Sequence, residues 1–247
     1  MTRTFILFFA LASMAVFNGC KDKENGDEPV KSAETTAEFD KSNFGLYKGI
    51  IVGSSGTIKI EINNGNNVVK ATITIDGKTD VLTCNSSPVN GQAMVNVVFS
   101  GSFSSFTFSV DADGKNPVIV NITIDGHSNV AAAVAKETSA NVASAYEGTG
   151  TGGNNARGVL NIVRNSNTFS GYYKSLDEQS QGLTFSVSGT VGNDGAFSGT
   201  SKSKLGAVLD VTLTYSGKFS GDNVSGTWKT SWEGGTNSGS FTGKKTL

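Results

Sequence analysis

The stretch Thr57-Ile58-Lys59-Ile60-Glu61-Ile62-Asn63 decides the fold class of this chain. Its three isoleucines point to one side of an extended backbone, whereas Lys59 and Glu61 point to the other, because side chains alternate between the two faces of a strand. The pattern predicts a β-strand with one buried and one solvated face. Such strands are typical of antiparallel sheets.

The same alternation recurs along most of the chain. In the first half, the residues that we expect to face inward are Val69, Ala71, Ile73, Ile75, Phe106, Phe108, Val110, Val118, Val120, Ile122 and Ile124. In the second half, we expect strands over residues 146–151, 157–164, 168–175, 183–191, 196–202, 208–219, 223–232 and 238–244. Asp76-Gly77, Asp113-Gly114 and Asp194-Gly195 join apolar runs and supply the positive φ of tight hairpins. The sequence therefore predicts an all-β protein built from antiparallel up-and-down meanders that close on themselves.

An internal repeat predicts how the meanders are divided. Ser188-Gly189-Thr190 followed by Phe197-Ser198-Gly199-Thr200 is echoed by Ser216-Gly217-Lys218 followed by Val224-Ser225-Gly226-Thr227. We interpret this as a duplication and expect two tandem barrels, residues 44–128 and 146–247. Residues 129–145 would form a linker, for which an Ala-rich run allows a helix. The alternative is one larger merged sheet or sandwich, since Ser-Gly is also a common turn or strand-kink pair.

The first residues have the features of an export signal. Arg3 precedes the apolar run Phe5 to Phe17, which is too short to span a bilayer, and Gly19 precedes Cys20. This end resembles a bacterial lipobox. The resemblance implies a lipoprotein signal peptide over residues 1–19, a lipidated Cys20 and a flexible charged tether over residues 20–43. The alternative is an ordinary secretory signal that leaves Cys20 as a free thiol.

The charged residues that follow Cys20 look like the surface-export signal of Bacteroidetes lipoproteins. The resemblance implies a protein anchored in the bacterial cell envelope, in the outer membrane and exposed at the surface. Its first partner would be the membrane itself, bound through the N-terminal lipid.

Composition excludes several classes of function. The chain has 247 residues with 20 Lys+Arg against 21 Asp+Glu, and its only arginines are Arg3, Arg157 and Arg164. We therefore expect no nucleic-acid partner, because such proteins need a basic face. Besides Cys20 the only cysteine is Cys84, so we expect a fold that rests on its hydrophobic core rather than on disulfides.

Residues that could carry catalysis are few. His127 is the only histidine, Cys84 ends an apolar run, and Asp111-Ala112-Asp113-Gly114 is better explained as a hairpin turn than as a calcium loop. The pair Asp177-Glu178 lies in a polar loop, where adjacent side chains point apart. We expect no enzymatic activity, no metal and no cofactor.

The best candidates for binding are aromatic. Trp228 and Trp232 share a face of one strand, and Tyr172 and Tyr215 lie in other strands of the same half. These rings either fill a core, line an apolar calyx or form a stacking platform for a sugar. Gly226-Thr227-Trp228 resembles the Gly-x-Trp signature of lipocalin and avidin-like barrels, which implies a small ligand-binding barrel.

Together these features predict a non-catalytic, surface-anchored lipoprotein that binds a small apolar ligand or a glycan. The alternative is a structural or adhesive envelope protein without a small-molecule site. Its Ser/Thr/Asn-rich outer face would then contact polymers or partners.

Overall fold

The computed structural model describes residues 32–52, 56–177, 180, 183–206 and 209–247. The predicted signal peptide, Cys20 and the first part of the predicted tether lie outside these residues. The described elements are η1 (Ala37–Phe39), β1 (Gly45–Val52), β2 (Gly56–Ile62), β3 (Val69–Ile75), β4 (Lys78–Cys84), β5 (Met94–Ser100), β6 (Ser104–Val110), β7 (Val118–Ile124), β8 (Ala131–Lys136), β9 (Ala143–Gly152), η2 (Gly153–Asn155), β10 (Arg157–Asn165), β11 (Thr168–Ser175), β12 (Thr184–Thr190), β13 (Ala196–Leu205), β14 (Leu209–Ser220), β15 (Asn223–Trp232) and β16 (Gly235–Lys245).

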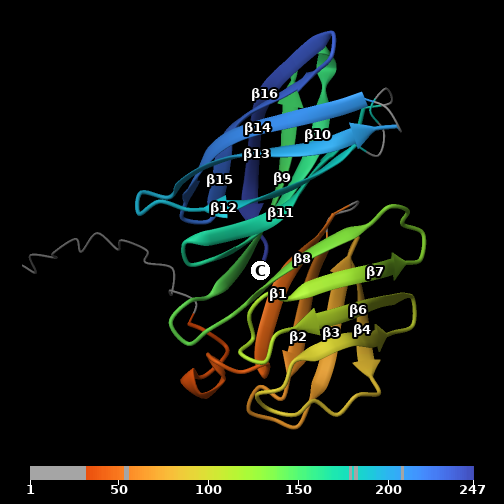
Figure 1. The fold of residues 1–247 in the computed structure, drawn as a ribbon, viewed down its shortest axis with the longest axis vertical. Coiled ribbons are helices and arrows are strands. Elements are labelled where there is room, and N and C mark those ends of the chain that lie inside the picture. Colours follow the sequence, from red (N-terminus) through yellow and green to blue (C-terminus); the bar gives the residue numbers. More distant parts are fainter. Residues whose placement is uncertain (1–31, 53–55, 178–179, 181–182, 207–208) are drawn as a thin grey trace, which may run out of the picture. The chain divides into compact units, whose positions relative to one another are not determined.

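The strands form two antiparallel, eight-stranded, nearly closed sheets (Figure 1). The first, which we call barrel 1, has the order β7-β6-β5-β4-β3-β2-β1-β8, so that β8 returns to pair with β1. The second, barrel 2, has the order β12-β11-β10-β9-β16-β15-β14-β13, so that β16 pairs with β9. The predicted fold class, all-β with two tandem barrels, is confirmed.

The alternating residues form the core of barrel 1 as expected. Ile58, Ile60 and Ile62 are all fully buried and pack with aromatic rings from β5 and β6. Burying an aliphatic side chain of this size stabilises a fold by about 1.5–3 kcal/mol. A row of three such residues on one strand therefore fixes the register of β2, because a slip by one residue would expose them all.

Barrel 2 is filled by large rings that lie over glycines. A Cβ atom on Gly158 would lie only 2.5 Å from the Tyr173 ring, and one on Gly152 only 2.5 Å from the ring of Trp228. Glycines at inward-facing positions thus provide the volume that the rings occupy. Small and large residues alternate in this way in the interiors of small barrels.

The predicted inward face of residues 118–125 is partly wrong. Val118 and Val120 are 48% and 42% exposed and Ile119 packs against the core instead, whereas Ile122 and Ile124 lie inward as expected. The register between β6 and β7 shifts here, and Asn121 has a φ of 52°. A bulge of this kind adds a residue to one strand and reverses the alternation beyond it.

Part of the segment expected to form a linker, Ala131–Lys136, is a strand, β8. β8 runs beside β1, where Val134 pairs with Gly49, and a Cβ atom on Gly49 would overlap the backbone of Ala133. Alanine has a high helix propensity, but its small side chain also suits a strand that packs closely, and tertiary pairing overrides propensity. Residues 32–247 form one compact unit, and whether each barrel folds alone stays a prediction.

The end of the expected tether is also ordered. Thr35, Phe39 and Asn43 are buried, and Phe39 ends the short 3-10 helix η1. We call residues 33–44 the strap. Its polar composition resembles that of a flexible linker, but its side chains find partners in barrel 1.

Candidate functional site

Trp228 and Tyr215 lie inside barrel 2. The Trp228 ring is 5% exposed, its centroid lies 5.8 Å from that of Tyr173, and its indole N–H donates to the carbonyl of Ser240 at 3.3 Å. The Tyr215 hydroxyl donates to the carbonyl of Ser188 at 3.0 Å and accepts from its N–H at 3.1 Å. The polar groups of both rings are therefore satisfied by barrel 2 itself.

The space around these rings is nearly filled. The void among the interior rings of barrel 2 measures about 10 Å³, which is at the lower limit for a single water molecule. A lipid or pigment needs a far larger cavity. The packing favours the core-filling interpretation of Trp228 over the calyx interpretation.

Tyr172 and Trp232 do not join this cluster. Tyr172 lies on the other face of β11, in register with Asn161 and Ser186. Trp232 ends β15 with 36% of its surface exposed and lies over Gly235. The four aromatic candidates therefore do not form one site, and Trp232 is the most exposed of them.

The outer surface of barrel 2 carries rows of hydroxyl groups. Cross-strand pairing aligns exposed side chains of β13, β14, β15, β16 and β9 in one row: Ser198, Ser216, Thr227, Ser240 and Thr151. The adjacent row contains Thr200, Thr214, Lys229 and Ser238. We call these two rows the hydroxyl face. Neighbouring strands lie about 4.8 Å apart, so the hydroxyls repeat at that interval across the sheet.

The hydroxyl face is shallow and open rather than deeply hollowed. Two open depressions of about 740 and 580 Å³ share Ser198, Ser216 and Thr227 and so adjoin each other. Ser216 Oγ and Thr227 Oγ1 are 3.2 Å apart, and the other hydroxyls of both rows have no protein partner among the described residues. Most donors and acceptors on this surface are thus open to solvent or to a ligand.

Two lysines border the depressions. Lys218 lines the larger depression and Lys229 the smaller. In the same sheet Lys204 pairs with Asp210 at 2.7 Å, but neither Lys218 nor Lys229 has an ion-pair partner in the part of the chain that the structure describes. Their ammonium groups therefore add further donors at the hydroxyl face.

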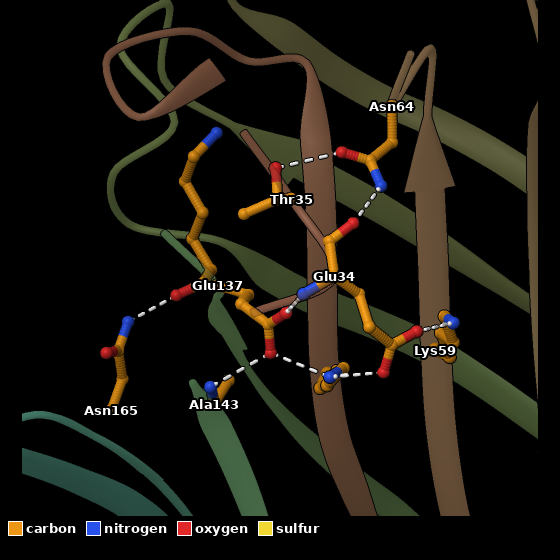
Figure 2. Close-up of polar contacts among 9 residues, drawn as sticks. Glu34, Thr35, Lys59, Asn64, Glu137, Ala143 and Asn165 are labelled. Atoms are coloured by element: carbon orange, nitrogen blue, oxygen red, sulfur yellow. Dashed lines mark hydrogen bonds and ion pairs between the residues drawn. The ribbon is translucent and has the colours of Figure 1, made fainter. Parts of the chain in front are cut away.

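An ionic cluster, buried at Lys48 and Glu137 but open to solvent at Glu34 and Lys59, joins the strap to barrel 1 (Figure 2). Lys48 Nζ lies 2.8 Å from Glu34 Oε1 and 2.7 Å from Glu137 Oε2. Glu34 also binds Lys59 at 2.6 Å, and these lysine contacts lower the pKa of Glu34 from 4.5 to about 2. Glu137 further accepts the backbone N–H groups of Glu34, at 2.6 Å, and Ala143, at 3.1 Å. Every charge in the cluster is thus compensated.

A second buried lysine binds the other end of the strap. Lys136 Nζ donates to the carbonyls of Ser42 and Phe44 and lies 5.1 Å from the centre of the Tyr47 ring. Burial lowers the pKa of Lys136 from 10.5 to about 8. Its ammonium group is thus used to hold backbone rather than to bind a carboxylate.

The remaining candidates for chemistry lie apart from one another. His127 Nε2 lies 3.5 Å from Asp76 Oδ2 at a turn, and Asp177 accepts the N–H of Arg157 at 2.8 Å. Cys84 is a free, half-buried thiol, and Asp113 pairs with Lys115 in its own turn. Among the described residues there is no group of three or more His, Cys, Asp or Glu side chains that could hold a metal ion. No helix in the described ranges is long and apolar enough to cross a membrane.

Sequence reasoning missed the ionic cluster and Asp80. Asp80 is 3% exposed and accepts four hydrogen bonds from the β5–β6 turn, from Ser102 N and Oγ, Phe103 N and Ser104 Oγ. A carboxylate at an inward position of a strand is the only sequence signal for it. Its role is to hold a turn, because its oxygens are occupied by that turn.

Comparison with known proteins finds no matching family model, no similar curated protein and no similar solved structure.

Proposed function

We propose that this chain is a non-catalytic, envelope-anchored lipoprotein that adheres to polysaccharide through the hydroxyl face of barrel 2. The observation that carries the proposal is the pair of adjoining depressions lined by exposed, unpartnered Ser and Thr hydroxyls. An aligned array of donors and acceptors suits a ligand that is itself a repeating array of hydroxyls. Weak contacts repeated along a polymer add up to useful affinity.

The interior of barrel 2 supports this choice over an apolar ligand. Its void of about 10 Å³ holds no guest without displacement of core rings. Displacing a packed aromatic side chain costs about as much as deleting it, roughly 3–5 kcal/mol. A surface site needs no such rearrangement.

The proposed lipid anchor is supported by the sequence of the N-terminal segment. The apolar run that ends before Cys20 supports acylation of its thiol, and stable attachment needs more than one chain of lipid. Replacement of Cys20 by Ser is expected to move the protein from the membrane fraction to the soluble fraction. A variant that still sediments with membranes would contradict the anchor.

Binding is tested by calorimetric titration of the unlipidated chain with soluble neutral and acidic polysaccharides. We expect Ser216→Ala and Thr227→Val each to weaken binding by about threefold to tenfold, the value of one net hydrogen bond. Thr83→Val is the matched control, because Thr83 is an exposed threonine on β4 of barrel 1. Equal affinities for all these proteins, or no affinity for any polysaccharide, would overturn the proposal and favour a purely structural role.

A further inference from the structure

The strap covers the end of barrel 1 at which β1 begins. In an up-and-down sheet the loops after β2, β4, β6 and β8 all lie at this same end. The strap contacts each of them. Thr35 Oγ1 donates to Asn64 in the loop after β2 at 2.8 Å, and Asn43 Nδ2 donates to the carbonyl of Val89 in the loop after β4 at 3.1 Å. Ser139 N, after β8, donates to Asp40 at 2.8 Å, and the Ser42 carbonyl lies so close to Gly114, in the loop after β6, that a Cβ atom on Gly114 would overlap it. The strap therefore bridges four loops that are far apart in sequence.

The middle of the strap is buried against barrel 1. Phe39 is 6% exposed and Asn43 is completely buried. The side-chain oxygen of Asn43 accepts a hydrogen bond from the N–H of Gly91 at 2.9 Å, and the backbone carbonyl of Asn43 accepts one from the hydroxyl of Tyr47 at 2.9 Å. The strap is thus part of the packed structure.

The two ends of the strap are held by two buried lysines from different strands. Lys48 of β1 holds the carboxylate of Glu34 at the beginning, and Lys136 of β8 holds the carbonyls of Ser42 and Phe44 at the end. Glu34 is the first strap residue with such a contact. Tension applied to the chain before residue 33 therefore reaches Glu34 before it reaches β1.

We infer that the strap is a mechanical clasp, in which the Glu34–Lys48–Glu137 cluster carries tension from the N-terminal side of the chain and protects β1 from being peeled out of barrel 1. This role does not depend on any ligand of the hydroxyl face. It suits a protein that is held through its N-terminal side and adheres elsewhere, because every detaching force would then pass through the strap.

The variant Glu34→Gln separates this role from folding. It removes the charge that binds Lys48 and Lys59, yet Lys48 keeps its contact with Glu137 at 2.7 Å, so no buried charge is left without a partner. Glu38→Gln is the matched control: Glu38 is an exposed strap residue with no ion pair among the described residues.

The experiment pulls between position 20 and barrel 1. Unlipidated chain 20–247 carries Cys84→Ser and Lys78→Cys, so that DNA handles attach to Cys20 and to the exposed β3–β4 turn at the far end of barrel 1. The measured quantity is the rate of the first extension at constant force. We expect Glu34→Gln to raise this rate at least about tenfold, because hydrogen bonds to charged groups are lost, and Glu38→Gln to leave it unchanged.

Urea unfolding and circular dichroism of the unstressed variants show whether the barrels remain intact. A first-extension rate for Glu34→Gln equal to that of the parent would overturn the inference, since the Glu34–Lys48–Glu137 cluster would then carry no tension. An equal increase for Glu38→Gln would also overturn it, because the effect would not belong to the cluster.

Discussion

Nζ of Lys48 lies 2.7 Å from Oε2 of Glu137, and the two side chains are only 2% and 0% exposed. The pair links β1 to the residue that directly follows β8. Two charges so far from water are stable only together, because each on its own would have to be desolvated without compensation.

Removal of one partner of this pair is expected to be costly. Glu137→Gln should lower the free energy of unfolding by about 3–5 kcal/mol, since Lys48 would keep only the partly exposed Glu34. Urea unfolding measures the effect. The double variant Lys48→Met with Glu137→Leu should lose less stability than the sum of Lys48→Met and Glu137→Leu measured singly, and a strictly additive result would contradict the coupling.

Acid should weaken barrel 1 through Asp80. Burial alone raises the pKa of this carboxyl, but hydrogen bonds from Ser104, Ser102 and Phe103 outweigh burial and hold the pKa well below its ordinary value of 3.8. A folded-state pKa below the unfolded value stabilises the protein above about pH 4, and this stability is lost as the pH falls toward the folded value. We expect the stability difference between the parent and Asp80→Asn to be largest at neutral pH and to shrink below pH 4, as followed by urea unfolding across this range. A difference that is constant with pH would show that the charge of Asp80 is unimportant.

The match between glycines and rings in barrel 2 can be tested at Gly158. Gly158→Ala places a methyl group where the Tyr173 ring lies and should destabilise the protein by about 1–3 kcal/mol. Tyr173→Leu in the same chain should recover part of this loss, because it removes the opposing atoms. Thermal unfolding of Gly158→Ala, Tyr173→Leu and the double variant measures this. If Gly158→Ala lowers stability equally in the parent and in the Tyr173→Leu protein, the steric explanation is refuted.

The two tryptophans should behave differently. Trp228→Ala removes a buried ring and should cost about 3–5 kcal/mol, whereas Trp232→Ala, at a half-exposed strand end, should change stability by about 0.5 kcal/mol. Fluorescence titration of the parent with fatty acids, pigments and oligosaccharides then tests for a guest. A saturable shift that vanishes in folded Trp232→Ala would assign a binding role to that ring, and a Trp228→Ala variant with unchanged stability would contradict its place in the core.

Local patterns in the sequence predicted much of the fold. Period-two alternation located strands such as β2 and β3, and Asp76-Gly77 marked the hairpin that follows β3, because both signals depend only on neighbouring residues. The bulge at Asn121 was missed, since asparagine at positive φ is compatible with an ordinary turn as well as with a kinked strand. The strand β8 was missed because an Ala-rich run acquires strand geometry only from its partner β1.

The candidate site was harder to predict than the fold. The sequence places Trp228 and Trp232 on one face, but whether an inward face borders a void depends on residues such as Gly152 and Tyr173 from other strands. The hydroxyl face depends on register, which aligns Ser198, Ser216 and Thr227 only after three strands pair. The ionic cluster likewise unites residues up to 103 positions apart, as between Glu34 and Glu137.

The position of β16 between β9 and β15 has a consequence for how the protein folds during its synthesis. The first strand of barrel 2, β9, pairs with β10 at once, but its other neighbour, β16, is complete only after nearly a hundred further residues have been synthesised, and contacts of such long range slow folding. Until then β9 and β15 each present an unpaired edge that could join other chains. Barrel 2 is therefore expected to fold after translation rather than during it, and a nascent chain stalled before residue 235 should be sensitive to protease throughout residues 143–232.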